Sequence, residues 1–295
     1  THRRPRVNDA MNLTVASSFT FDLEHDADAL LQFEAAPTPQ QRVIQSRTHI
    51  LGHETMNRIA AEDDIGERIW LHARGRVEVR YKATLDIARA PAPLKGLTAL
   101  APHRLPGSAV KFLFDSRYCH GAQFVDFTDA QFGAIPVGGE RIAAMRDWVA
   151  SHIAYVPGAS GAGTTAIDTF QSGQGICRDY AHLFVTLARA SAIPARYVAC
   201  YAPGVTPQDF HAVAEVFLAD PDRPSEGRWH LVDATGMADL EHAAIIGVGR
   251  DAGDVSFLTS FGPMQFVESS VEVTLAPGPC EPGDQGVEPG RPIAA

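Results

Sequence analysis

Residues 173–183 read Gly173-Gln-Gly-Ile-Cys-Arg-Asp-Tyr-Ala-His-Leu183, a glycine-containing loop that leads into an apolar helical pattern. The pattern predicts a helix over Cys177–Ser191, because Ile193-Pro194 cannot continue it. At the start of a helix, free backbone N–H groups and the positive end of the dipole favour a thiolate and can hold an oxyanion. We therefore predict that Cys177 is a nucleophile. The alternative is a small buried hydrophobic residue.

Two further residues complete a predicted catalytic group. His211 begins a strand-like run, His211–Leu218, and Asp233 lies near the end of another, Arg228–Ala234. The turn-rich residues 220–227 separate the runs, so an antiparallel hairpin about residue 222 would bring His211 and Asp233 together. A carboxylate on one imidazole nitrogen leaves the other free to take the thiol proton. The order Cys177, His211, Asp233 predicts a nucleophile, a base and an orienting acid.

The same segments resemble the transglutaminase-like superfamily, in a bacterial branch of cysteine proteases with an N-terminal β domain. The resemblance covers nearly the whole chain except its ends. It implies a papain-like core with Cys177, His211 and Asp233 in the three catalytic roles. The matching runs are Tyr155-Val-Pro-Gly-Ala-Ser, Gly175-Ile-Cys-Arg-Asp-Tyr-Ala-His-Leu, Ile193-Pro-Ala-Arg-Tyr-Val, Asp209-Phe-His-Ala, Arg228-Trp-His-Leu-Val-Asp-Ala-Thr and Gly249-Arg-Asp-Ala-Gly-Asp-Val, with Ser116-Arg-Tyr-Cys as the expected linker.

Around the nucleophile we assign a substrate and oxyanion region that contains Tyr155, Gly175, Ile176 and Val213. Gly173 and Gly175 would let a substrate backbone approach closely. The related family usually has tryptophan two residues after the catalytic histidine, where this chain has Val213. Since an indole would form a wall of the cleft, valine predicts a roomier or differently shaped acyl site.

The hydrophobic periodicity predicts an α+β fold. Residues 76–87 alternate apolar and polar side chains, as a half-buried strand does. Many such short runs predict an N-terminal antiparallel, sandwich-like β domain over residues 10–133. A helical period at 140–153 then opens a catalytic domain over residues 134–275, in which the nucleophile helix packs on an antiparallel sheet. Residues 276–295 are rich in proline and glycine, which predicts a disordered tail.

Composition restricts the functional classes. Of 295 residues, 25 are Lys or Arg and 35 are Asp or Glu, giving a net charge of −10, which argues against a phosphate-neutralising nucleic-acid surface. No apolar run is long enough for a membrane span, and we expect a cytoplasmic protein. The four cysteines, at positions 119, 177, 200 and 280, are too scattered for a disulfide scaffold. We expect no metal or other cofactor, because His49 and His53 lack a third ligand.

The predicted function is cysteine-dependent acyl transfer on a peptide, protein or small amide substrate, without nucleic-acid or membrane partners. Attack by Cys177 on an amide carbonyl would give a thioester, which water or an amine resolves. We favour water, and hence a peptidase or amidase. The alternatives are amine transfer, as in a transglutaminase, and a non-catalytic binding module that keeps the fold.

Overall fold

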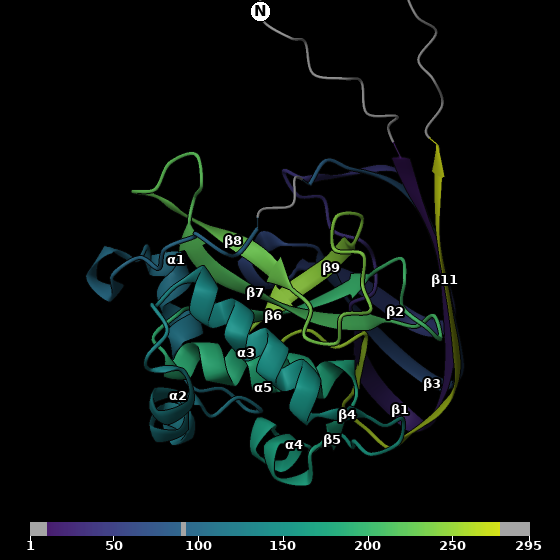
Figure 1. The fold of residues 1–295 in the computed structure, drawn as a ribbon. Helices are drawn as coiled ribbons and strands as arrows, with labels where there is room; N and C mark the ends of the chain where they lie inside the picture. The colour runs from purple at the N-terminus through teal and green to yellow at the C-terminus, as the bar shows by residue number, and fades with distance from the viewer. Residues whose placement is uncertain (1–10, 90–92, 278–295) are drawn as a thin grey trace, which may run out of the picture.

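The computed structural model describes residues 11–89 and 93–277. Long strands and a cluster of helices lie on opposite sides of a smaller central sheet (Figure 1). The strands are β1 (Met11–Leu31), β2 (Gln41–Ala60), β3 (Glu67–Ile87), β4 (Ala154–Tyr155), β5 (Gln174–Gly175), β6 (Ala195–Tyr201), β7 (His211–Ala219), β8 (Gly227–Val232), β9 (Ala244–Gly249), β10 (Leu258–Ser260) and β11 (Met264–Pro277). The α-helices are α1 (Gly107–Val110), α2 (Val125–Phe132), α3 (Gly139–His152), α4 (Ala166–Ser172) and α5 (Cys177–Ala190), with short 3₁₀ turns at Glu62–Asp64, Pro102–Arg104, Lys111–Leu113 and Gly121–Phe124.

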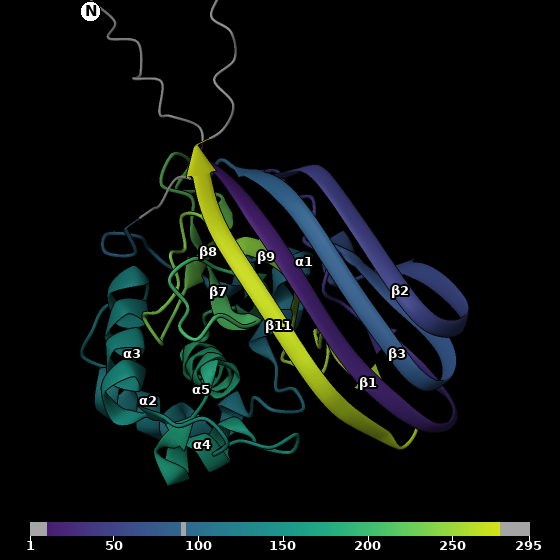
Figure 2. The same cartoon turned by 90° about the vertical axis from the view of Figure 1, so that its right-hand side faces the viewer.

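The first sheet consists of long antiparallel strands. Its order is β10-β1-β3-β2, and β11 also pairs with β1. Alternate side chains of β1 are buried, among them Val15, Phe19 and Phe21, as the sequence alternation predicts. Figure 2 shows β11, β1, β3 and β2 side by side, with the helices behind them.

This sheet differs from the predicted N-terminal domain in two respects. The predicted short strands merge into three strands of about twenty residues, which form one sheet rather than a sandwich of their own. The sheet is also discontinuous in sequence, because β11 comes from the segment assigned to the catalytic domain and pairs Val15 with Val273. The boundaries 10–133 and 134–275 are therefore wrong for residues 258–277. Strand pairing across almost the whole chain has no local signal.

The second layer over the long strands is the central sheet, with antiparallel order β8-β7-β6-β9. Tyr201 at the end of β6 and Ile246 in β9 belong to the same buried cluster as Phe19 and Tyr81. The Tyr201 hydroxyl donates to the Phe33 carbonyl at 2.6 Å and lies 2.9 Å from the Ser17 hydroxyl. The two sheets thus share one core, and the mixed α+β architecture is confirmed.

Helices cover the central sheet on the side away from the long strands (Figure 1). Helix α5 is buried from Asp179 to Arg189 and packs on β7, and α3 packs against α5. Residues 102–133 were assigned to the β domain, but Cys119, Phe124 and Phe132 lie in the same cluster as α5. These residues are therefore part of the helical layer.

The ends of the chain bear on two further expectations. Strand β11 continues to Pro277, so residues 276 and 277 are ordered by pairing with β1, contrary to the predicted tail boundary. The remainder of the predicted tail, 278–295, and the basic start of the chain lie outside the described residues. Among the residues that are described, no helix is long and apolar enough to cross a membrane.

Candidate active site

Cys177 is the first residue of α5, as predicted. The turn before it is fixed by Asp179, whose buried carboxylate accepts a hydrogen bond from the Ile176 N–H at 2.9 Å. Gly175 lies so close to this aspartate that a Cβ would come within 2.7 Å of the Asp179 Cβ. Glycine at 175 therefore allows the loop to pass over the first turn and to present Cys177, which is partly exposed.

His211 and Asp233 meet at the open end of the β7–β8 hairpin. The register pairs Ala214 with Val232, so the hairpin turns close to the predicted centre at residue 222. His211 Nε2 lies 3.3 Å from Asp233 Oδ2, at the long end of the hydrogen-bonding range, and both side chains are buried. Asp233 is itself fixed by hydrogen bonds from the Thr235 N–H at 2.8 Å and the Ala238 N–H at 2.9 Å.

The electrostatic environment couples His211 to both partners. Burial by itself lowers the pKa of His211, but hydrogen bonds with Asp233 and Cys177 and their negative charge outweigh it and raise that pKa to about 9. Burial also opposes ionisation of Asp233, yet the hydrogen bond and charge of His211 lower the Asp233 pKa below its ordinary value. With Nε2 directed at Asp233, Nδ1 is the nitrogen available to the thiol.

Tyr155 lies next to the nucleophile because β4 and β5 pair Tyr155 with Gly175. Burial, and then the charge of Cys177, raise the pKa of Tyr155 to about 12, so its hydroxyl stays protonated at neutral pH. A protonated hydroxyl beside the sulfur can donate to negative charge that develops there. Tyr155 thus lies beside the nucleophile, and its part in substrate or oxyanion binding stays a prediction.

The other described cysteines are unsuitable nucleophiles. Cys119 and Cys200 are fully buried, and burial raises the pKa of both thiols. All three described cysteines are free, whereas Cys280 lies outside the described residues. Exposure to solvent therefore distinguishes Cys177 within the described part of the chain.

The segment that contains Cys177, His211 and Asp233 matches a known protein family. Residues 128–234 match the model of the transglutaminase-like superfamily, and this range contains Cys177, His211 and Asp233. This segment is a transglutaminase-like domain. Its fold is that of a class of cysteine-dependent enzymes.

Individual relatives extend the comparison. A putative cysteine protease from Cytophaga hutchinsonii has a crystal structure with 27% identity and a TM-score of 0.83, covering 93% of this chain and 94% of that one. An uncharacterized protein of Mycobacterium leprae is 30% identical over 120 residues, which are 39% of this chain. The matched region spans only 41% of that relative's length. Because the match with the Cytophaga hutchinsonii structure covers 93% of this chain, that structure includes counterparts of both the long strands and the transglutaminase-like domain.

A polar latch beside the nucleophile was not found from the sequence. The Ser160 hydroxyl donates to Asp179 Oδ1 at 2.9 Å, and Arg178 Nη2 donates to the Ser160 hydroxyl at 2.7 Å. These bonds fix the loop of residues 157–165 against the first turn of α5. The sequence signal was only a glycine- and serine-rich loop, which does not reveal its contact.

Two of the matching sequence runs, Ser116-Arg-Tyr-Cys and Gly249-Arg-Asp-Ala-Gly-Asp-Val, contact each other and His182. Tyr118, from the Ser116-Arg-Tyr-Cys run, stacks on His182 at 5.0 Å between ring centroids and donates its N–H to Asp251 Oδ2 at 2.9 Å. The Ala252 N–H donates to His182 Nε2 at 3.1 Å. His182 therefore ties α5 to the turn at 249–255.

Two sequence assignments require correction. Val213 is only 1% exposed and packs with Val205, Leu231 and Met237, so it lies in the core and does not line the acyl site. The predicted roomier cleft at this position is therefore wrong, because loop residues cover the smaller side chain. Gly173 ends α4 with a φ of 65°, a left-handed conformation that favours glycine, so its role is a helix cap.

No cluster of three or more metal-ligating side chains occurs among residues 11–89 and 93–277. His49 and His53 lie on the long edge strand β2, in accordance with the strand pattern of the sequence.

Proposed function

We propose that this chain is a cysteine-dependent acyl-transfer enzyme that hydrolyses a peptide or amide bond. The observation that supports this most strongly is His211 placed between the partly exposed Cys177 and the buried Asp233, with its pKa raised to about 9. An imidazolium beside the sulfur stabilises a thiolate and can later protonate a leaving amine.

The reaction follows from the position of each group. The Cys177 sulfur attacks the carbonyl carbon, and the C–N bond breaks as His211 gives its proton to the amine. Backbone N–H groups at the start of α5 and the Tyr155 hydroxyl are the donors near the developing oxyanion. His211 then takes a proton from water as water attacks the thioester, which releases an acid and regenerates the thiol.

Amine transfer is the second candidate, and Asp209 favours it. Burial raises the pKa of Asp209, and the charge of the nearby His211 partly offsets this effect. The charge of Asp209 in turn helps to raise the pKa of Tyr155. A carboxylate at this position would attract the ammonium form of an amine acceptor. The non-catalytic alternative rested on Val213, and the burial of Val213 in the core removes that support.

The decisive experiment is a mass-spectrometric screen of the wild type against Cys177→Ala. Peptides, capped amides and amine donors are incubated together with each protein. We expect cleavage with uptake of water by the wild type and none by Cys177→Ala, while Cys200→Ser, a change at a buried thiol, retains activity in proportion to its folded fraction. Products that contain the added amine would favour transfer. Equal products from wild type and Cys177→Ala would contradict the proposal.

A further inference from the structure

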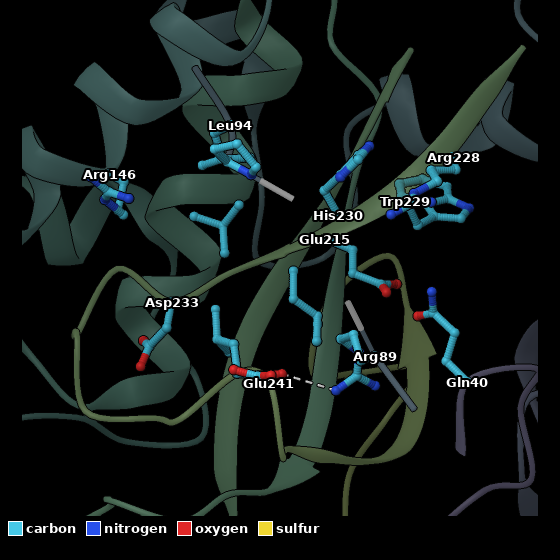
Figure 3. A pocket seen from close by; sticks show the side chains of 14 residues that line it. Gln40, Arg89, Leu94, Arg146, Glu215, Arg228, Trp229, His230, Asp233 and Glu241 are labelled. Carbon is cyan, nitrogen blue, oxygen red and sulfur yellow. Dashed lines mark hydrogen bonds between the residues drawn. The ribbon is translucent and has the colours of Figure 1, made fainter. Parts of the chain in front are cut away.

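A cavity of about 270 Å³ lies along the outer edge of β8, and Figure 3 shows the side chains around it. Asp233 lines one end, but neither Cys177 nor His211 lines the cavity. The cavity therefore lies beside the orienting carboxylate of Asp233 and not at the sulfur.

Arg89 brings a guanidinium with an unpartnered hydrogen-bond donor to this cavity. Its Nη1 donates to the Leu240 carbonyl at 3.0 Å and the Ala243 carbonyl at 2.8 Å. Its Nη2 is buried and has no hydrogen-bond partner in the described part of the protein. Glu215 lines the same cavity, but its carboxylate is paired with Arg196 at 2.7 Å. Asp233 and Glu241 also line the cavity, but neither accepts a hydrogen bond from Arg89 Nη2 within the described residues. A buried donor without a partner is unfavourable unless a ligand atom accepts from it.

A second unsatisfied group lines the cavity. His230 is 6% exposed, and its Nε2 is buried without a partner among the residues described. Burial lowers the pKa of His230, so the ring is neutral at pH 7 and presents one donor and one acceptor nitrogen. A neutral imidazole suits an amide rather than a second anion.

The third feature is the strand edge itself. β8 is the outermost strand of the central sheet and pairs with β7 only, as far as the described residues show. Residues 228–233 all line the cavity, so the cavity follows this free edge. A free edge offers backbone N–H and C=O groups to an extended peptide. Leu94, Leu231 and Leu240 supply apolar walls.

We propose that this cavity binds the carboxyl-terminal end of a peptide, with the terminal carboxylate on Arg89 and the preceding amide along the edge of β8. Its volume suits a ligand the size of about two residues. Gln40 and Arg89 lie on the same side of the cavity, where the carboxylate would lie (Figure 3). This inference does not depend on the proposed reaction.

The test is a calorimetric titration with N-acetylglycine, its amide and acetate. We expect N-acetylglycine to bind the wild type. The uncharged amide and acetate should each bind with an affinity at least roughly tenfold lower. Arg89→Gln should lose affinity for N-acetylglycine by a similar factor, whereas Arg42→Gln, which removes an exposed arginine of β2, should not. The readout needs no turnover, so it is independent of Cys177 chemistry.

Three results would overturn the proposal. Equal affinity for N-acetylglycine and its amide would exclude the carboxylate contact, and equal affinity for acetate would exclude the amide contact. Unchanged binding by Arg89→Gln would place the ligand elsewhere. If Arg89→Gln fails to fold, a crystal of the wild type soaked with N-acetylglycine decides, because the carboxylate must lie at Arg89 Nη2.

Discussion

His211 is buried and yet holds a proton more tightly than an imidazole in water, because hydrogen bonds and charge interactions with Asp233 and Cys177 outweigh the effect of burial on its pKa. Removing either neighbour would remove part of what raises this pKa. The chemistry of the site therefore depends on the pairwise fit of Cys177, His211 and Asp233 rather than on any one residue. This dependence can be tested at His211 and at Asp233.

The first prediction concerns pH. Because the pKa of His211 is raised to about 9, the imidazolium is present below that pH and is lost as pH rises through it. We expect kcat/KM for the substrate found by mass spectrometry to fall above about pH 9, since neutral His211 cannot protonate the leaving amine. A profile that stays level well above this pH would remove His211 from the acid role.

The second prediction concerns Asp233→Asn. An amide permits the wrong imidazole tautomer and supplies no charge, so we expect kcat to fall by about 10³- to 10⁴-fold. The alkaline limit of the pH profile should also move to lower pH, which a purely structural defect would not produce. Asp239→Asn, in the loop after Asp233, is the matched control and should leave both quantities almost unchanged.

The loop before α5 determines how the sulfur is presented. It is confined from both sides, by the pairing of Gly175 with Tyr155 and by the contact of Gly175 with Asp179. The latch of Ser160 and Arg178 adds a third restraint. A single added methyl group should therefore displace the nucleophile.

The third prediction concerns Gly175, in the loop before α5. In Gly175→Ala, the new Cβ would lie 2.7 Å from Asp179 Cβ, so backbone must move. We expect a loss of about 1–3 kcal/mol in the free energy of unfolding in urea and a larger fractional loss of activity. Gly163→Ala introduces a methyl group into open space in the neighbouring loop and serves as control. Similar effects of both substitutions would show that the close contact is unimportant.

The positions of the three proposed catalytic residues could be predicted because each lies where the local sequence signal is strong. Cys177 begins an apolar helix, and His211 and Asp233 bracket a hairpin whose turn is evident from its prolines and glycine. The latch at Ser160 could not be predicted, because its partners lie on a loop without periodicity. Val213 was misplaced because strand alternation gives a face but not what covers that face.

We expect the described part of the molecule to unfold as one cooperative unit, because the long sheet and the transglutaminase-like domain share a core. Tyr201 joins them through the Phe33 carbonyl and Ser17. The predicted domain boundary failed for the same reason. The strand that completes the first sheet follows the catalytic segment, and no local pattern of residues reveals such a distant pairing.

The fourth prediction tests this cooperativity. Tyr201→Phe leaves the buried Phe33 carbonyl without its donor and should lower the free energy of unfolding by about 1–3 kcal/mol. Tryptophan fluorescence and circular dichroism should still report one coincident transition in urea. Phe210→Tyr, which keeps the aromatic ring tilted against Tyr201 at 5.4 Å between centroids, is a control that leaves the Tyr201 hydroxyl in place. Two separated transitions would mean that the sheets fold independently.

The pairing of β1 with β11 also affects events on the ribosome. β1 leaves the exit tunnel before β11, so one edge of β1 stays unpaired while the residues between Leu31 and Met264 are translated. At roughly 5–20 residues per second, this interval lasts tens of seconds. During that time Phe19 and Phe21 lack part of the core that buries them in the folded protein. The unpaired backbone groups of β1 are then accessible to chaperones and to strands of neighbouring chains.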